Sequence, residues 1–183
     1  MTKADGSMMD LDQLQQALAA AETKNVYAAI VNAPFEQRGA AAFRFLGITV
    51  YLRVNHETGT IDRIALSNTE LAKRTTDVSV VPFEEIKIPL GQADNIIAQA
   101  IERQHPEDTT DWKFLFDPAL TAEQARINQA NAGIAYSAVY PLAAGDGGAL
   151  IFSYFQYDQG LGQAQRDFMA AYAAMVDERL ALG

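Results

Sequence analysis

Aromatic side chains are the residues of this sequence best suited to holding a small molecule. They gather in one short stretch and on two later segments: Trp112, Phe114, Phe116, Tyr136, Tyr140, Phe152 and Tyr154. Tyrosine and tryptophan join an apolar body to a polar tip, which suits a small planar ligand. Any single aromatic residue is more often part of an ordinary core or interface. The sharper prediction is that the cluster as a whole surrounds a cavity and binds a ligand.

No arrangement of residues predicts catalysis or a metal site. The chain has no cysteine, which excludes disulfides, cysteine nucleophiles and thiolate metal sites. It also lacks a nucleophile elbow, an HExxH motif and a phosphate loop. His56 lies in a predicted turn and His105 at a predicted helix end, so we expect both to be exposed rather than bound to haem. We predict no catalytic residue, no metal and no cofactor.

Three arginines could meet an anionic ligand. They are Arg53, Arg63 and Arg126. Isolated arginines are more often solvated or paired on a surface. The sequence leaves both interpretations open.

The charge of the chain argues against two classes of partner. Its 14 basic and 23 acidic residues give a net charge of −9, and such a surface repels nucleic acid and anionic membranes. No apolar run approaches the ~18 residues of a membrane span. The polar start "MTKADGSMMDLDQ" lacks the basic-then-apolar order of a signal peptide. We therefore expect a cytoplasmic protein.

The first part of the chain predicts helices and then a β-hairpin. Asp10 is a candidate helix cap, and Leu11, Leu14 and Leu18 follow on one narrow stripe. A second helix is expected over residues 26–43, interrupted near Pro34. Alternating apolar residues then predict a strand over 48–54 and a hairpin through residues 55–68.

The rest of the chain alternates between strands and helices. Residues 86–89 and 108–117 are predicted strands, with a helix between them over 93–105. The next helix begins at Asp117-Pro118 or at a Thr121 cap and ends at Gly133. Two antiparallel strands follow, over 134–142 and 149–157, joined through Gly145, Gly147 and Gly148, and a last helix spans 163–182. About six short strands with hairpins predict an α+β fold with a mostly antiparallel sheet flanked by helices.

The C-terminal half resembles a GAF domain, a sensory and regulatory module. The positions that match the family's layout are Gly133, Ser137, Val139, Pro141, Leu142, Gly148, Leu150 and Phe168. A looser match extends upstream, so the resemblance covers roughly residues 26–180. It implies a profilin- or PAS-like fold over residues 26–183, with the start and first helix, residues 1–25, outside it.

The resemblance implies a function and also limits it. Family members include sensors of cyclic nucleotides, bilins, haem and small metabolites. The missing cysteine excludes a covalent bilin and the activity of methionine-sulfoxide reductases of this fold, and the chain has no Asn-Lys pair typical of cyclic-nucleotide binding. The leading hypothesis is a non-catalytic domain that binds a small molecule between sheet and helices and signals through its terminal helices. The alternative is a dimerisation module without a ligand.

Self-association through the end helices is the expected quaternary structure. Leu11, Leu14 and Leu18 form an apolar stripe outside the stretch that resembles the family. Packing them and the last helix against a second copy would give a four-helix bundle. Packing against the last helix of the same chain is the intramolecular alternative. We expect a homodimer.

Overall fold

An antiparallel sheet forms the centre of the molecule, and its strands run in the order β3-β2-β1-β6-β5-β4. The computed structural model describes residues 5–36, 44–155 and 162–183. The strands are β1 (Leu46–Asn55), β2 (Thr60–Leu66), β3 (Lys87–Pro89), β4 (Glu107–Thr109), β5 (Tyr136–Leu142) and β6 (Gly148–Tyr154). The predicted α+β fold with about six mostly antiparallel strands is confirmed.

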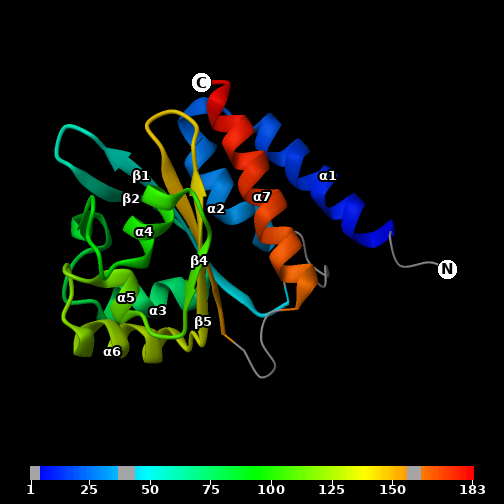
Figure 1. Ribbon diagram of the computed structural model, residues 1–183. Coiled ribbons are helices and arrows are strands. Elements are labelled where there is room, and N and C mark those ends of the chain that lie inside the picture. The colour runs from blue at the N-terminus through cyan, green and yellow to red at the C-terminus, as the bar shows by residue number, and fades with distance from the viewer. Residues whose placement is uncertain (1–4, 37–43, 156–161) are drawn as a thin grey trace.

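Helices cover both faces of the sheet (Figure 1). One face carries α1 (Asp5–Ala20), α2 (Val26–Glu36) and α7 (Gln163–Ala181), with the 3₁₀ turn η1 (Thr23–Asn25) between the first two. The other face carries α3 (Glu70–Val78), η3 (Phe83–Glu85), α4 (Ile96–Arg103), α5 (Lys113–Phe116) and α6 (Ala122–Ala132). The predicted packing of the N- and C-terminal helices against each other is present.

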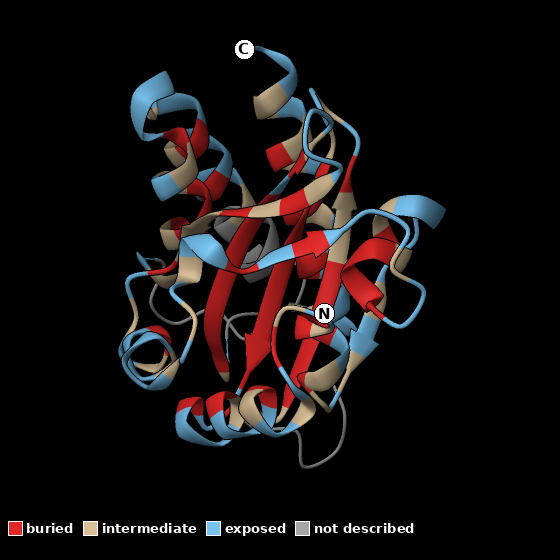
Figure 2. Cartoon of the chain, turned by 90° about the vertical axis from the view of Figure 1, so that its left-hand side faces the viewer, coloured by how far each residue is buried: buried red, intermediate tan, exposed pale blue. Residues whose placement is uncertain are grey.

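The sheet separates two hydrophobic cores because side chains alternate along each strand. Ile48, Val50 and Ile151 point toward α3–α6, whereas Tyr51 and Phe152 point toward α2 and α7. Figure 2 shows the central strands buried along their length, with the outer helix surfaces exposed. Each face of the sheet therefore has its own hydrophobic core, covered by its own set of helices.

Two predictions for the N-terminal helices need correction. The first helix begins at Asp5, so Asp10 lies within it and is not its cap. The second helix is not interrupted at Pro34, which lies inside α2. A proline in a helix removes one backbone donor. Here the hydroxyl of Tyr172 in α7 supplies a donor in its place.

The segment before α6 also differs from the prediction. The expected strand over 108–117 is replaced by β4, which ends at Thr109, and by the helical turn α5. The next helix starts after Thr121, whose side chain forms a capping box with Gln124, and not at Asp117-Pro118. Gly133 ends α6 in a left-handed conformation, as predicted.

Tyr172 of α7 supplies the donor that Pro34 lacks. In a regular helix the amide of residue 34 would donate to the carbonyl of Ile30, but proline has no N–H. The hydroxyl of Tyr172 instead donates to Ile30 O at 2.7 Å, in a buried position. This bond ties α7 to α2 and satisfies a carbonyl that would otherwise be buried without a partner.

The substitution Tyr172→Phe should lower the free energy of unfolding by about 1–3 kcal/mol, because it leaves that carbonyl unpaired. Pro34→Ala restores the amide, so in that background Tyr172→Phe should cost clearly less. Urea denaturation of both single variants and the double variant measures this coupling. Equal costs of Tyr172→Phe in the two backgrounds would contradict the explanation.

The leucines of α1 are already covered within one chain. Leu14 is 0% and Leu18 2% exposed, and both belong to the core shared with α7. Arg179 of α7 donates to the carbonyls of Leu18 and Ala21, each at 3.1 Å. Leu11 is partly buried against the same core. The intramolecular alternative therefore describes how these leucines are covered within the chain. The expected homodimer stays a prediction.

Within residues 5–36, 44–155 and 162–183, no helix combines the length and apolarity that a membrane span requires.

Candidate functional site

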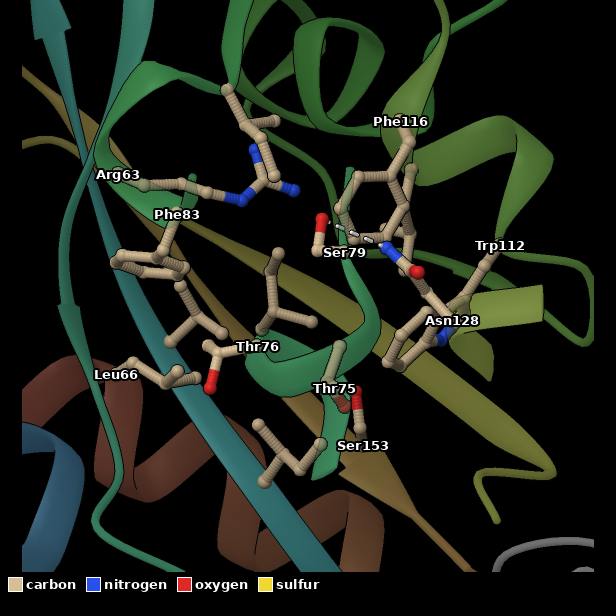
Figure 3. Close-up of a pocket in the computed structure, with 15 residues that line it drawn as sticks. Arg63, Leu66, Thr75, Thr76, Ser79, Phe83, Trp112, Phe116, Asn128 and Ser153 are labelled. Atoms are coloured by element: carbon tan, nitrogen blue, oxygen red, sulfur yellow. Dashed lines mark hydrogen bonds between the residues drawn. The ribbon is translucent and has the colours of Figure 1, made fainter. Parts of the chain in front are cut away.

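A cavity lies between the sheet and the helices that cover it on the side of α3 (Figure 3). Strands β1, β2 and β6 provide its floor, and α3, η3, α5 and α6 provide its walls. Its volume is about 50 Å³. A single water molecule needs roughly 10–15 Å³ of such space, so a few waters or a small organic group fit without rearrangement. We call this cavity the Arg63 pocket after the one charged side chain among the described residues that line it.

Arg63 and Leu66 both reach the pocket because strand β2 contains a β-bulge between them. Leu52 pairs with Arg63 and Tyr51 with Ala65, so Ile64 is the extra residue on β2. Strict alternation would have placed residues 61, 63 and 65 on one face. Arg63 lies on the pocket side with Ile61 as alternation requires, and the bulge brings Leu66 rather than Ala65 to that side.

The guanidinium of Arg63 is buried without a counter-charge. The residue is 5% exposed, and its Nη1 has no hydrogen-bond partner. Among the residues that the structure describes, no carboxylate forms an ion pair with it. The ring of Phe116 lies 4.6 Å from its Cζ and offers a cation–π contact. Desolvation lowers the pKa of Arg63 to about 9, so the side chain remains charged at neutral pH.

An unpaired buried charge costs stability, and Arg63→Met should therefore stabilise the protein without ligand by about 1–4 kcal/mol at pH 7. The gain should shrink as the pH rises above 9, because folded Arg63 then loses its proton while unfolded arginine keeps it. Urea denaturation of both proteins at pH 7 and pH 10 tests this, and other titrating groups cancel in the difference. A less stable Met variant at pH 7 would show that Arg63 has a partner in the folded chain.

The hydroxyl groups of α3 and of the loop that follows it already donate their protons within the chain. Thr75, Thr76 and Ser79 donate their hydroxyl protons to backbone carbonyls at 3.1, 2.9 and 2.8 Å. Asn128 donates to Ser79 Oγ at 3.2 Å (Figure 3). Arg63 Nη1 is therefore the unpartnered buried donor in the described lining of the pocket.

Trp112 is held firmly against the pocket floor. Its Nε1 donates to Ser137 Oγ at 2.9 Å, and the Ser137 hydroxyl is bonded to that of Ser153 at 2.7 Å. These serines face each other on β5 and β6. Since the chain has one tryptophan, its fluorescence reports directly on this site.

The predicted aromatic cluster does not surround one cavity. Trp112 and Phe116 line the Arg63 pocket, but Phe114 is 38% exposed beside Lys113. The cause is α5: in a strand, positions 112, 114 and 116 would share a face, whereas in a helical turn positions 112 and 116 do. Because this segment is helical and not a strand, Trp112 and Phe116 face the pocket and Phe114 does not.

The four strand aromatics belong to the opposite face of the sheet. Ser137, Val139, Ile151 and Ser153 point toward the pocket side of the sheet, so their sequence neighbours point away. These neighbours pack in the core shared with α1, α2 and α7: Tyr136, Tyr140, Phe152 and Tyr154. They are separated from the pocket by the sheet, and the prediction that they share one cavity with Trp112 was wrong.

The remaining candidates lie outside the pocket. Arg126 forms a bidentate ion pair with Asp111 at 2.6 and 3.1 Å, and this arginine holds the pKa of Asp111 below its usual range. Arg53 is exposed. His56, in the hairpin turn, and His105 are both exposed as predicted. No cluster of three or more potential metal ligands occurs in the described part of the chain.

Sequence reasoning missed the residues that α3, η3 and α6 add to the pocket. Phe83, Asn128 and the hydroxyl residues of α3 line it, and the helix over 70–78 was not predicted. Thr69 could have indicated this helix, because its side chain caps the amide of Ala72 and an acidic residue follows it.

Comparison with solved structures shows what this architecture is similar to. The GAF domain of a phosphoenolpyruvate-protein phosphotransferase from Coxiella burnetii is 14% identical, with a TM-score of 0.66 over 99% of this chain and 96% of that one. The corresponding domain from Acinetobacter is 10% identical, with a TM-score of 0.66 over 98% and 95%. Free methionine-R-sulfoxide reductase from Neisseria meningitidis is 12% identical, with a TM-score of 0.62 over 98% and 93%.

Sequence comparison gives no such likeness. No protein-family model matches the chain, and no curated protein matches it at a significant level. The similarity therefore concerns the fold, and it extends over nearly the whole length of the chain. By its sheet order, its flanking helices and these structural matches, the chain has a GAF-like fold.

Proposed function

We propose that the chain is a non-catalytic sensory or regulatory domain that binds a small molecule in the Arg63 pocket. The observation that supports this most is a buried, unpartnered charge facing a cavity beside Trp112. Evolved interiors rarely retain such a charge without a role. The GAF domains of similar structure belong to a phosphotransferase and to a sensor protein. A reductase of this fold is disfavoured because the chain has no cysteine.

The proposed signal crosses the sheet through β6. Ile151 and Ser153 line the pocket, and Phe152 between them points to the other face. There its ring contacts Phe168 and Tyr172 of α7, with centroids 5.9 and 6.3 Å apart. A shift of β6 on ligand binding would therefore change the packing of α7, and with it the α1–α7 pair.

Native mass spectrometry of freshly purified protein, followed by thermal-shift and Trp112 fluorescence measurements with a panel of metabolites, tests the proposal. A ligand of the pocket should raise the melting temperature and change the fluorescence. Leu66→Phe narrows the pocket and should weaken binding. Ile64→Phe is the matched control, because Ile64 lies on the same strand and packs in the opposite core.

Two outcomes would count against pocket binding. One is that no retained molecule and no member of the panel affects the wild-type protein. The other is a ligand whose affinity falls equally in the Leu66 and Ile64 variants. Hydrogen exchange in α7 then tests the signalling step separately: binding should alter its protection, and unchanged exchange would remove the proposed path through Phe152.

A further inference from the structure

We propose that the ligand of the Arg63 pocket is a small organic monocarboxylate whose carboxylate group pairs with the guanidinium of Arg63. This inference rests on the proposed function, since it names the chemical class that the same pocket takes. Three features of the pocket lead to it.

The first feature is the missing counter-charge. Arg63 is buried, and its Nη1 has no partner. The acidic residue closest along β2, Asp62, is occupied elsewhere: it accepts from Asn55 and Thr60 and lies 3.8 Å from Lys87. A bound anion would replace the lost hydration of the guanidinium, and a planar carboxylate matches its fork of donors.

The second feature limits the charge of the ligand to a single negative unit. The hydroxyls of Thr75, Thr76 and Ser79 have already donated their protons to backbone carbonyls. No second cationic side chain lines the pocket among the described residues. A phosphate dianion or a nucleotide would bring charge that nothing here neutralises, and the net charge of −9 further disfavours polyanions.

The third feature is the apolar body of the pocket. Phe83, Leu115 and Ile151 are among the apolar residues that line it. The ring of Phe116 lies 4.6 Å from the guanidinium carbon of Arg63 (Figure 3). Such walls accept hydrocarbon and reject a second polar end. The volume of about 50 Å³ admits only a small molecule.

The experiment compares acids with their uncharged analogues. Benzoate, butyrate and isovalerate are titrated into the protein at pH 7 beside benzamide, butyramide and isovaleramide, and Trp112 fluorescence and the melting temperature are followed. At least one carboxylate should bind at least tenfold more tightly than its amide. Inorganic phosphate serves as a further probe and should have no effect.

Arg63→Met should abolish the preference for the acid, and Arg63→Lys should retain part of it. Arg53→Met removes the same charge from an exposed position of the neighbouring strand and should leave binding unchanged. Circular dichroism and the melting temperature confirm that each variant is folded. Because Arg63→Met is expected to be more stable, lost binding cannot be ascribed to unfolding.

The alternative outcomes separate this inference from the proposed function. Amides that bind as well as acids, with binding lost in Leu66→Phe, would overturn the carboxylate class and leave the pocket's role intact. Phosphate that binds as tightly as the carboxylates would also overturn it. Carboxylates that bind to both Arg63→Met and Leu66→Phe as tightly as to the wild-type protein would overturn both proposals. If no carboxylate bound the wild-type protein, the carboxylate proposal alone would be overturned.

Discussion

Replacing Gly148 with alanine is expected to lower the free energy of unfolding by about 3 kcal/mol, the upper end of overpacking costs. A Cβ at this position would lie 2.1 Å from the carbonyl oxygen of Leu52 and 3.3 Å from the Cα of Arg53. Both are backbone atoms of β1, the central partner of β6, so no side-chain rotation can relieve the clash. The strands would have to separate where they begin to pair. Urea denaturation followed by Trp112 fluorescence measures the loss.

Gly145→Ala in the same turn is the control. Gly145 has a φ of +61°, but no heavy atom lies within 4 Å of the place that an alanine methyl group would take. Its substitution should therefore cost only the left-handed strain of about 1–2 kcal/mol. If both variants lost the same stability, the close approach of β1 would not be what requires glycine at position 148. The sequence identified these residues jointly as turn glycines, and the structure gives them different roles.

The sheet could be predicted because its signal is local. Ile48, Val50, Leu52 and Val54 alternate in the sequence and point to one face in the structure, as the pleat requires. Helix α3 gave a weaker signal, since Ala72 is its only fully buried residue. A helix that buries so little has no long apolar stripe to detect.

The site was harder to predict because it depends on departures from regular periods. A bulge at Ile64 brings Leu66 to the same side as Arg63, and periodicity alone cannot place such a bulge. The wrong period in residues 112–116 placed Phe114 with Trp112. Arg63 was one of three candidate arginines, and only tertiary structure shows that it lacks a partner while Arg126 has one.

Changing Leu14 and Leu18 together to glutamate should release α1 from the rest of the fold. Each leucine is buried, so the loss of apolar burial alone amounts to about 1.5–3 kcal/mol per residue, and two carboxylates would also be forced into a core without partners. Limited proteolysis should then cleave within α1, and Trp112 should keep its folded emission because it lies on the far face of the sheet.

The matched control is Gln15→Glu with Ala19→Glu, which adds the same two charges at the same spacing on exposed positions of α1. This variant should resist proteolysis like the wild type. Size measurements over a range of concentrations accompany both variants, because the leucines would have a different role in a dimer. A leucine variant that keeps α1 protected and merely changes from dimer to monomer would show that these side chains face a second copy. A leucine variant in which α1 is cleaved while the oligomeric size stays unchanged would show that the two leucines pack within a single chain. The bonds from Arg179 to the end of α1 hold the helix in that same position.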